Sequence, residues 1–178
     1  MKNLKKTISI IMLMTATFSM SVASAPEKEE RPMHEIHSMM VYNFMKYVNW
    51  PPAAASGDFV IGVIGDDGVY ETLTKYYGGK NKGSQKITIK RFDSAADLAD
   101  CHVLYIGKSK SSLFTSVISK VGGKSTLIIT DKSGLGKKGS GINFKTVDNK
   151  LKFELNQAAV DKAQLKISSQ LAAMAIKV

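Results

Sequence analysis

The stretch Phe59-Val-Ile-Gly-Val-Ile64, followed by Gly65-Asp66-Asp67-Gly68, decides the fold class of this chain. The first part is a short, unbroken apolar run, which predicts a strand buried on both faces of a sheet. The Gly-Asp-Asp-Gly segment predicts a tight turn into a helix, because glycine and aspartate favour turns and helix starts. The predicted helix has its apolar face at Tyr70, Leu73 and Tyr77 and ends at Gly78-Gly79. A buried strand that turns directly into a helix is typical of α/β proteins.

The same alternation continues on both sides of this stretch. Upstream, a helix is predicted to end at Trp50-Pro51-Pro52, because proline cannot continue a helix. Its apolar stripe recurs at helical spacing and consists of Ile36, Met39, Met40, Phe44, Tyr47 and Val48. Downstream, the pattern predicts strands at 87–92, 102–106 and 126–130, a short helical turn within 93–100, and a helix that starts at Ser111 or Ser112, passes Ile118 and ends at Gly122-Gly123.

The last part of the chain changes from strand–helix units to a hairpin. Residues 142–144 predict a strand, and a turn at Asp148-Asn149 leads into the alternating strand 151–155. Asn156 is predicted to cap a helix over 157–163, and Ser168 to cap a last apolar helix. Together these elements predict a single-domain α/β fold, a helix–sheet–helix sandwich with a mostly parallel sheet and a C-terminal antiparallel edge hairpin.

The composition is that of an ordinary globular domain. Of the 178 residues, 44% are hydrophobic and 22% are charged, which excludes disordered, collagen-like and coiled-coil classes. The one cysteine, Cys101, excludes an intrachain disulfide and a multi-thiolate metal site. The net charge of +10 comes from scattered lysines without interleaved stacking aromatics. We therefore expect a solvated basic face and no nucleic-acid partner, with an anionic partner or membrane surface as the alternative.

The first 25 residues have the pattern of a secretory signal peptide. Three lysines precede an apolar segment from Ile8 to Met20, and small residues follow it. Cleavage is predicted after Ala23 or Ala25. The alternative is an uncleaved anchor helix, which is disfavoured because the apolar segment is short for a membrane span. Residues 26–33 are then a flexible leader to a folded domain over 34–178, and the product is expected to be exported.

Six sequence blocks follow one another along residues 38–175, and the first and longest runs from Met39 to Pro51. The residues singled out in these blocks, all expected to be structural, are Tyr42, Asn43, Phe44, Lys46, Pro51, Asp66, Asp67, Cys101, His102, Asn143, Phe144, Glu154, Asn156, Ser168 and Ser169. In this order the blocks resemble the YfiR-like family. Members of that family are periplasmic proteins that repress membrane diguanylate cyclases.

The resemblance implies a compact α/β domain that forms homodimers in the periplasm. It implies binding to the periplasmic sensor region of an inner-membrane diguanylate cyclase, which holds down cyclic-di-GMP synthesis and biofilm formation, with no catalysis by the protein itself. Better-known members carry disulfides, and this chain has one cysteine, so redox control through paired cysteines is not expected. The alternative is a periplasmic sensor module that binds a small ligand between the loops after its strands and acts on a membrane histidine kinase or another receptor.

Two motifs have both a ligand-binding and a structural interpretation. Gly134-Leu-Gly136-Lys-Lys-Gly139 matches G-x-G-x-x-G, but a strand follows where dinucleotide binding requires a helix. We interpret it as a glycine-rich loop in which Lys137 and Lys138 are available to an anion or a partner. Asp66-Asp67 would suit Mg²⁺, but one of them capping the following helix is favoured.

Histidine and cysteine candidates are likewise weighed against structural roles. Cys101 and His102 are adjacent on a strand, so they point to opposite faces and form no dyad. Cys101 is expected to be a buried apolar residue, with an intermolecular disulfide as the alternative. His34 and His37 have a helical spacing that would suit a metal, but without an evident third ligand we expect both to be solvent-exposed.

The remaining candidates are aromatic and polar. Tyr47 and Trp50 are expected to pack in the core at the helix end or, as the alternative, to form an exposed anchor for a partner. Glu154 is expected to face away from the core and to pair with Lys152 or Lys166. Asn143 is expected to order the backbone of the glycine turn. The sequence predicts no catalytic residue, no cofactor and no metal ligand.

Overall fold

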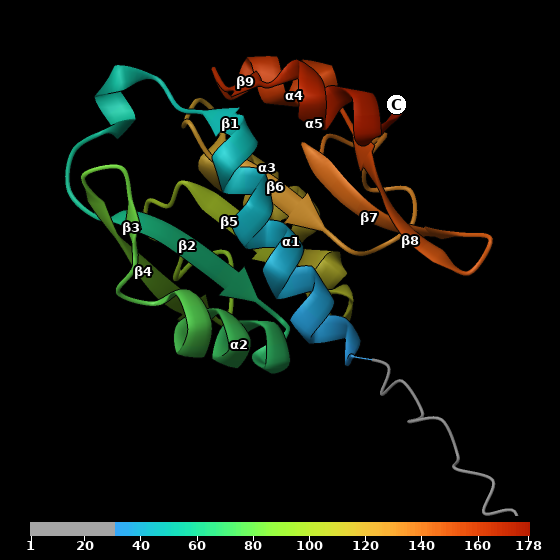
Figure 1. Cartoon of the computed structure of the whole chain (residues 1–178), viewed down its shortest axis with the longest axis horizontal. Helices are drawn as coiled ribbons and strands as arrows, with labels where there is room; N and C mark the ends of the chain where they lie inside the picture. Colours follow the sequence, from blue (N-terminus) through green and yellow to red (C-terminus); the bar gives the residue numbers. More distant parts are fainter. Residues whose placement is uncertain (1–30) are drawn as a thin grey trace, which may run out of the picture. The chain divides into compact units, whose positions relative to one another are not determined.

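The computed structural model describes residues 31–178, which form a mixed α/β fold around a mostly parallel, eight-stranded sheet (Figure 1). The strands of this sheet are β2 (Phe59–Ile64), β3 (Asn81–Lys82), β4 (Gln85–Phe92), β5 (Val103–Ile106), β6 (Leu127–Thr130), β7 (Ile142–Val147), β8 (Lys150–Leu155) and β10 (Ile176–Lys177). The helices are α1 (Met33–Tyr47), η1 (Pro52–Ala54), α2 (Asp67–Tyr77), η2 (Lys108–Leu113), α3 (Phe114–Val121), α4 (Gln157–Lys162) and α5 (Ser169–Met174). A separate antiparallel pair joins β1 (Val48–Asn49) to β9 (Lys166–Ile167).

The strand order is β10-β8-β7-β6-β5-β2-β4-β3. Strands β4, β2, β5, β6 and β7 run parallel, whereas β8 is antiparallel to β7 and β3 is antiparallel to β4. From β2 the chain first adds β4 on one side and then β5 on the other. The order therefore reverses between β2 and β5, and their carboxyl ends form the switch point at which open α/β sheets commonly bind ligands.

Alternating strand side chains fill two apolar clusters. One contains Val63 and Tyr105 with residues of α1, α2 and α5. The other contains Ile64 and Leu104 with α3 and Cys101. This alternation confirms that the short apolar runs are strands buried on both faces. Figure 1 shows α1 and α2 in front of the sheet in that view.

The predicted apolar stripe of the first helix is confirmed in part, because Phe44 and Val48 are buried and Met40 and Tyr47 pack against the core. The buried residues of α1 are His37, Ser38, Val41, Phe44 and Met45. Met39 is 38% exposed, although it was placed in the stripe. Two of the buried residues are polar, and the Ser38 hydroxyl donates to the carbonyls of His34 (2.7 Å) and Val69 (3.3 Å). Hydrophobic spacing alone misses a face whose polar groups are satisfied internally.

Three of the predicted helix caps are confirmed. The side chains of Asp66, Asn156 and Ser168 accept hydrogen bonds from the first turns of α2, α4 and α5. The cap at Ser111 or Ser112 is wrong, because η2 runs directly into α3 and Leu113 takes the cap position without a side-chain bond.

The predicted turn at Asp148-Asn149 is also confirmed, since both residues have positive φ (49° and 57°), as a two-residue hairpin of this type requires. Two other predictions need correction. Residues 93–100 form bends and turns without a helix. The hairpin β7–β8 does not form the sheet edge, because β10 pairs in parallel beyond β8.

The predicted signal peptide, both cleavage positions and most of the leader lie outside the described residues. Within residues 31–178, no helix combines the length and apolar character that crossing a bilayer demands.

Phe44 provides a test of the α1 packing. Its ring is 3% exposed and lies 4.9 Å from the ring of Phe153 and 5.9 Å from that of Phe144. We expect Phe44→Ala to lower the free energy of unfolding by about 3–5 kcal/mol, because it leaves a cavity between α1 and the sheet. Urea denaturation measures this. Met39→Ala on the exposed side of the same helix is the control and should change the value by less than about 0.5 kcal/mol. Equal effects of the two changes would show that this packing is wrong.

Cys101 provides a second test. The residue is 6% exposed, and burial raises the pKa of its thiol to about 12, with the nearby Asp100 carboxylate adding to the effect. We expect the folded protein not to react with a thiol-specific disulfide reagent at pH 8, because reaction requires an accessible thiolate. The same protein in concentrated guanidinium should react at its single cysteine. Rapid labelling of the folded protein would contradict this burial, whereas a failure to react in guanidinium would favour the intermolecular disulfide.

Candidate functional site

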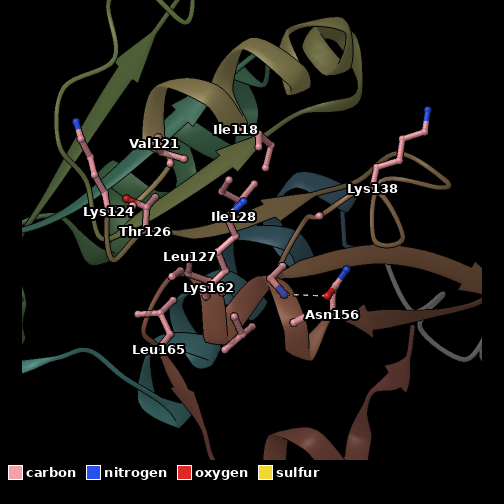
Figure 2. Close-up of a pocket in the computed structure, with 18 of the residues that line it drawn as sticks. Ile118, Val121, Lys124, Thr126, Leu127, Ile128, Lys138, Asn156, Lys162 and Leu165 are labelled. Carbon is pink, nitrogen blue, oxygen red and sulfur yellow. Dashed lines mark hydrogen bonds between the residues drawn. The ribbon is translucent and has the colours of Figure 1, made fainter.

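A pocket of about 320 Å³ opens between the end of α3, the start of β6, the glycine-rich loop and α4 (Figure 2). Its floor consists of apolar side chains of the core, namely Leu127, Ile128, Val160 and Leu165, together with the half-buried Ile118. The volume falls within the range of small-molecule sites, which are usually apolar clefts with a few polar groups.

Lysines surround this apolar floor. The lining residues include Lys124, Lys137, Lys138 and Lys162, all exposed, and no aspartate or glutamate. Figure 2 shows Lys124 and Lys138 extending outward at opposite sides of the opening. Lys124 is ion-paired with Asp100. Lys137 and Lys138, which were predicted from the sequence to be available to an anion or a partner, thus line this pocket. The other residues of the pocket come from α3, β6 and α4, and the sequence did not indicate that they lie near these lysines.

Asn156 links two walls of the pocket. Its Oδ1 accepts from the backbone N–H of Ala159 (2.9 Å), the bond drawn in Figure 2. Its Nδ2 donates to the carbonyl of Gly136 (2.8 Å). The predicted cap of α4 therefore also fixes the glycine-rich loop against that helix.

The glycine-rich loop closes over a buried carboxylate. Glu154 is 4% exposed, which contradicts the prediction that it faces away from the core. Its partners are Asn143 Nδ2 (2.8 Å) and Lys145 Nζ (3.0 Å), not Lys152 or Lys166. A Cβ at Gly136 would lie 2.5 Å from Glu154 Oε2, so only glycine permits this approach. Burial opposes ionisation of Glu154, but the bonds from Asn143 and Lys145 outweigh it, and the net pKa lies below its ordinary value.

Asn143 was predicted to order the backbone of the glycine turn, and this prediction is wrong. Its side chain bonds other buried side chains instead. It is fully buried, and its Oδ1 accepts from the hydroxyl of Thr130 (2.6 Å). Thr130 in turn bonds Ser140 (2.9 Å). Thr130 thus holds the Ser140 end of the loop, and Gly136 allows close packing, whereas Gly134 and Gly139 supply positive φ (86° and 113°).

Trp50 and His102 form an aromatic corner beside β2. The Trp50 indole N–H donates to the His102 carbonyl (3.2 Å), and its ring lies edge-on to Phe59 at 4.9 Å. His102 Nδ1 accepts from the Val60 N–H (3.0 Å), so its Nε2 carries the proton and donates to the Ala54 carbonyl (2.8 Å). Both rings therefore have structural partners. Trp50 and Tyr47 are half-buried against the core, and the anchor role predicted as their alternative stays a prediction.

The outer side of α1 carries the other aromatic motif residues. Tyr42 stacks on Tyr77 of α2 with centroids 4.1 Å apart. The Lys46 ammonium lies 4.8 Å from the Tyr42 ring centre and donates to Asn43 Oδ1 (3.2 Å). These contacts pair α1 with α2 and order the solvent-facing side of the helix.

A second group of polar residues meets at the switch point. His37, which was predicted to be exposed, is 6% exposed, and its Nδ1 lies 3.0 Å from the Tyr105 hydroxyl. That hydroxyl also lies 3.2 Å from Asp131 Oδ2 and 3.5 Å from Asp66 Oδ2. Asp67 does not join the group, because it is exposed and ion-paired with Arg91 at 2.9 Å. We call His37, Asp66, Tyr105 and Asp131 the switch-point cluster.

His37, Tyr105 and Asp131 of the switch-point cluster have pKa values displaced from their ordinary range. Burial lowers the pKa of His37 to about 4, and it raises the pKa values of Tyr105 and Asp131. His37 and Asp66 were recognised as candidates from the sequence for separate reasons, but Asp131 was not. Its position could have revealed it, because Asp131 comes directly after the strand predicted at 126–130, just as Asp66 comes soon after the strand predicted at 59–64. Both aspartates therefore stand at the carboxyl ends of strands, where α/β proteins place their sites.

Comparison with known proteins gives one family and several structural neighbours, among them the two that follow. A profile of the YfiR/HmsC-like family matches residues 34–176. A conserved domain protein of Vibrio cholerae superposes with a TM-score of 0.54 at 11% identity, over 81% of this chain and 59% of that one. An ABC domain of Streptococcus pneumoniae in complex with L-Trp gives 0.50 at 11% identity, over 67% and 54%.

At such identities the two structures show a common fold alone, and this chain spans less than two thirds of either. The comparison with curated proteins finds no match. The family profile covers nearly the whole of the described domain and agrees with the resemblance seen in the sequence. The chain belongs to the YfiR/HmsC-like family.

Proposed function

We propose that this protein is a periplasmic, non-catalytic regulator that represses a membrane diguanylate cyclase. The family match over residues 34–176 is the observation that carries the proposal. The signal-peptide pattern of residues 1–25 supports export. In this role the protein binds the periplasmic sensor region of the cyclase as a homodimer and lowers cyclic-di-GMP and biofilm formation.

The mechanism is one of differential affinity. A repressor shifts the cyclase toward its inactive state only by the difference between its affinities for the two states of the sensor region. No bond needs to be made or broken. Signals that sequester or unfold the repressor then release the cyclase. The predicted contacts Tyr47, Trp50, Lys137 and Lys138 are the first positions at which to seek the docking surface.

Co-expression tests this function. Cells carrying a membrane cyclase with a periplasmic sensor region, encoded beside this gene, should contain several-fold less cyclic-di-GMP when the full chain is co-expressed. Mass spectrometry of cell extracts measures the change. A chain lacking residues 1–25 is the matched control, since without export it cannot reach the sensor region and should have no effect. Unchanged cyclic-di-GMP with the full chain, or an equal fall with the control, would contradict periplasmic repression.

The pocket favours a second candidate function, that of a ligand-binding sensor acting on a membrane kinase or another receptor. Its apolar floor and lysine rim suit a small amphipathic anion, whose apolar body replaces water on the floor while the lysines attract its charge. The two functions are compatible, because a ligand that prefers one conformation of a repressor tunes its affinity for the cyclase.

A thermal-shift series tests the pocket. We expect 4-phenylbutyrate to raise the melting temperature of the purified protein, by a stabilisation of about 2.7 kcal/mol at a hundred times its dissociation constant. The neutral amide of the same acid should stabilise less. Lys162→Met should weaken the effect of the acid, while Lys75→Met, an exposed lysine of α2 outside the pocket, should not. Equal stabilisation by acid and amide would contradict the role of the lysines.

A further inference from the structure

We propose that His37, Asp66 and Asp131 of the switch-point cluster bind one divalent transition-metal ion, with the Tyr105 hydroxyl as a further oxygen at the site. One ligand atom from each of the three residues lies within 4.8 Å of the other two. A tetrahedral ion holds its ligand atoms about 3.4 Å apart at metal–ligand distances near 2.1 Å. The longest of these distances therefore needs to shorten by up to about 1.4 Å (4.8 Å less 3.4 Å), which side-chain rotation of the two aspartates can supply.

The fold brings these residues together from distant parts of the sequence. Asp66 follows β2, Asp131 follows β6, and His37 comes from α1, which packs across this face of the sheet. Tyr105 lies on β5 between the two aspartates. His37 lies on a helix of 15 residues and Tyr105 on a central strand, while the two aspartates come directly after strand ends, within two residues of the packed sheet.

A shortage of hydrogen-bond donors distinguishes this cluster from a closed polar network. Tyr105 has one hydroxyl hydrogen, yet its oxygen lies within 3.5 Å of His37, Asp66 and Asp131. Even if His37 donates to the hydroxyl, that hydrogen can satisfy only one carboxylate. Asp131 Oδ1 is buried and accepts no hydrogen bond from any described residue. A cation would satisfy the oxygens that lack a donor.

The charges at the site also suit a cation. Within residues 31–178, neither Asp66 nor Asp131 forms a salt bridge. Asp66 uses Oδ1 to cap α2 at the Val69 N–H (3.0 Å) and keeps Oδ2 on the cluster side. His37 stacks flat on Phe144, with ring centroids 4.2 Å apart and an angle of 1° between the planes. The imidazole is therefore oriented, and burial keeps it neutral, as a metal ligand must be.

The donor set selects the class of ion. One imidazole nitrogen with carboxylate and phenol oxygens suits Zn²⁺, Co²⁺ or Mn²⁺ better than Ca²⁺, which prefers oxygen ligands alone, or Mg²⁺, which keeps much of its water. Bound there, the ion would tie α1 to the carboxyl ends of β2 and β6.

Calorimetric titration of the chelator-treated, exported protein with Zn²⁺ tests the proposal. We expect one ion per chain with a dissociation constant in the micromolar range or below. Asp131→Asn and Asp66→Asn should each weaken binding at least tenfold. Both variants are expected to fold, because asparagine also caps helices and Asp131→Asn replaces a carboxylate that has one buried oxygen without a hydrogen-bond donor. The melting temperature of metal-free Asp131→Asn should equal or exceed that of the wild type.

Asp67→Asn is the matched control, an exposed carboxylate beside Asp66 that is paired with Arg91, and it should bind Zn²⁺ as the wild type does. The absence of wild-type binding, or equal binding by wild type, Asp131→Asn and Asp66→Asn, would overturn the site. Displacement of Zn²⁺ by an equal concentration of Mg²⁺ or Ca²⁺ would overturn the class of ion. None of these outcomes depends on repression of a cyclase, so the site and the proposed function fail separately.

Discussion

The parallel pairing of β2 with β5 is the constraint on which the rest of the structure depends. It sets Ile61 opposite Val103 and Ile64 opposite Ile106, at the point where the strand order reverses. In this register Gly62 of β2 is so closely surrounded that no larger residue fits there, because a Cβ would lie 2.8 Å from the Phe92 ring and 2.9 Å from Leu104. With both faces of the sheet buried, a shift by one residue would move every side chain to the wrong apolar cluster. The same register brings Asp66 and Asp131 to one edge.

The sequence predicted the fold well where local signals agree with burial. Unbroken apolar runs identified β2, β5 and β6, an alternating run identified β4, and glycine pairs or capping side chains marked most helix ends. It failed where burial depends on partners distant in the chain. Ser38, His37 and Glu154 are polar and buried, and each is satisfied by a residue that hydrophobic spacing cannot reveal. Strands of two residues, such as β3 and β10, have no pattern of their own and exist through their neighbours.

The candidate sites were likewise predictable only where they depend on local sequence, and not where residues distant in the chain come together. The lysines of the glycine-rich loop were recognisable from sequence, but the floor beneath them comes from α3, β6 and α4. The G-x-G-x-x-G pattern has a structural explanation that needs no phosphate, namely the close approach of Gly136 to Glu154 and the positive φ of Gly134 and Gly139. His37 was expected to be exposed and Asp66 or Asp67 to cap a helix, because the third member of the site, Asp131, lies 65 positions after Asp66. Such long-range convergence is a property of the strand order and not of any local motif.

The small ribbon β1–β9 has a consequence for how the protein is made. Val48 pairs with Ile167, and the Ser168 N–H donates to the Tyr47 carbonyl (2.9 Å), so the end of the first helix is fastened to the last tenth of the chain. Strand β10 likewise completes the sheet only through residues 176–177. Contacts of such long sequence separation slow folding and leave a growing chain open. On the ribosome the domain therefore cannot close before residues 166–177 have been synthesised, and until then the preceding segments stay extended enough to be threaded or handed to a chaperone.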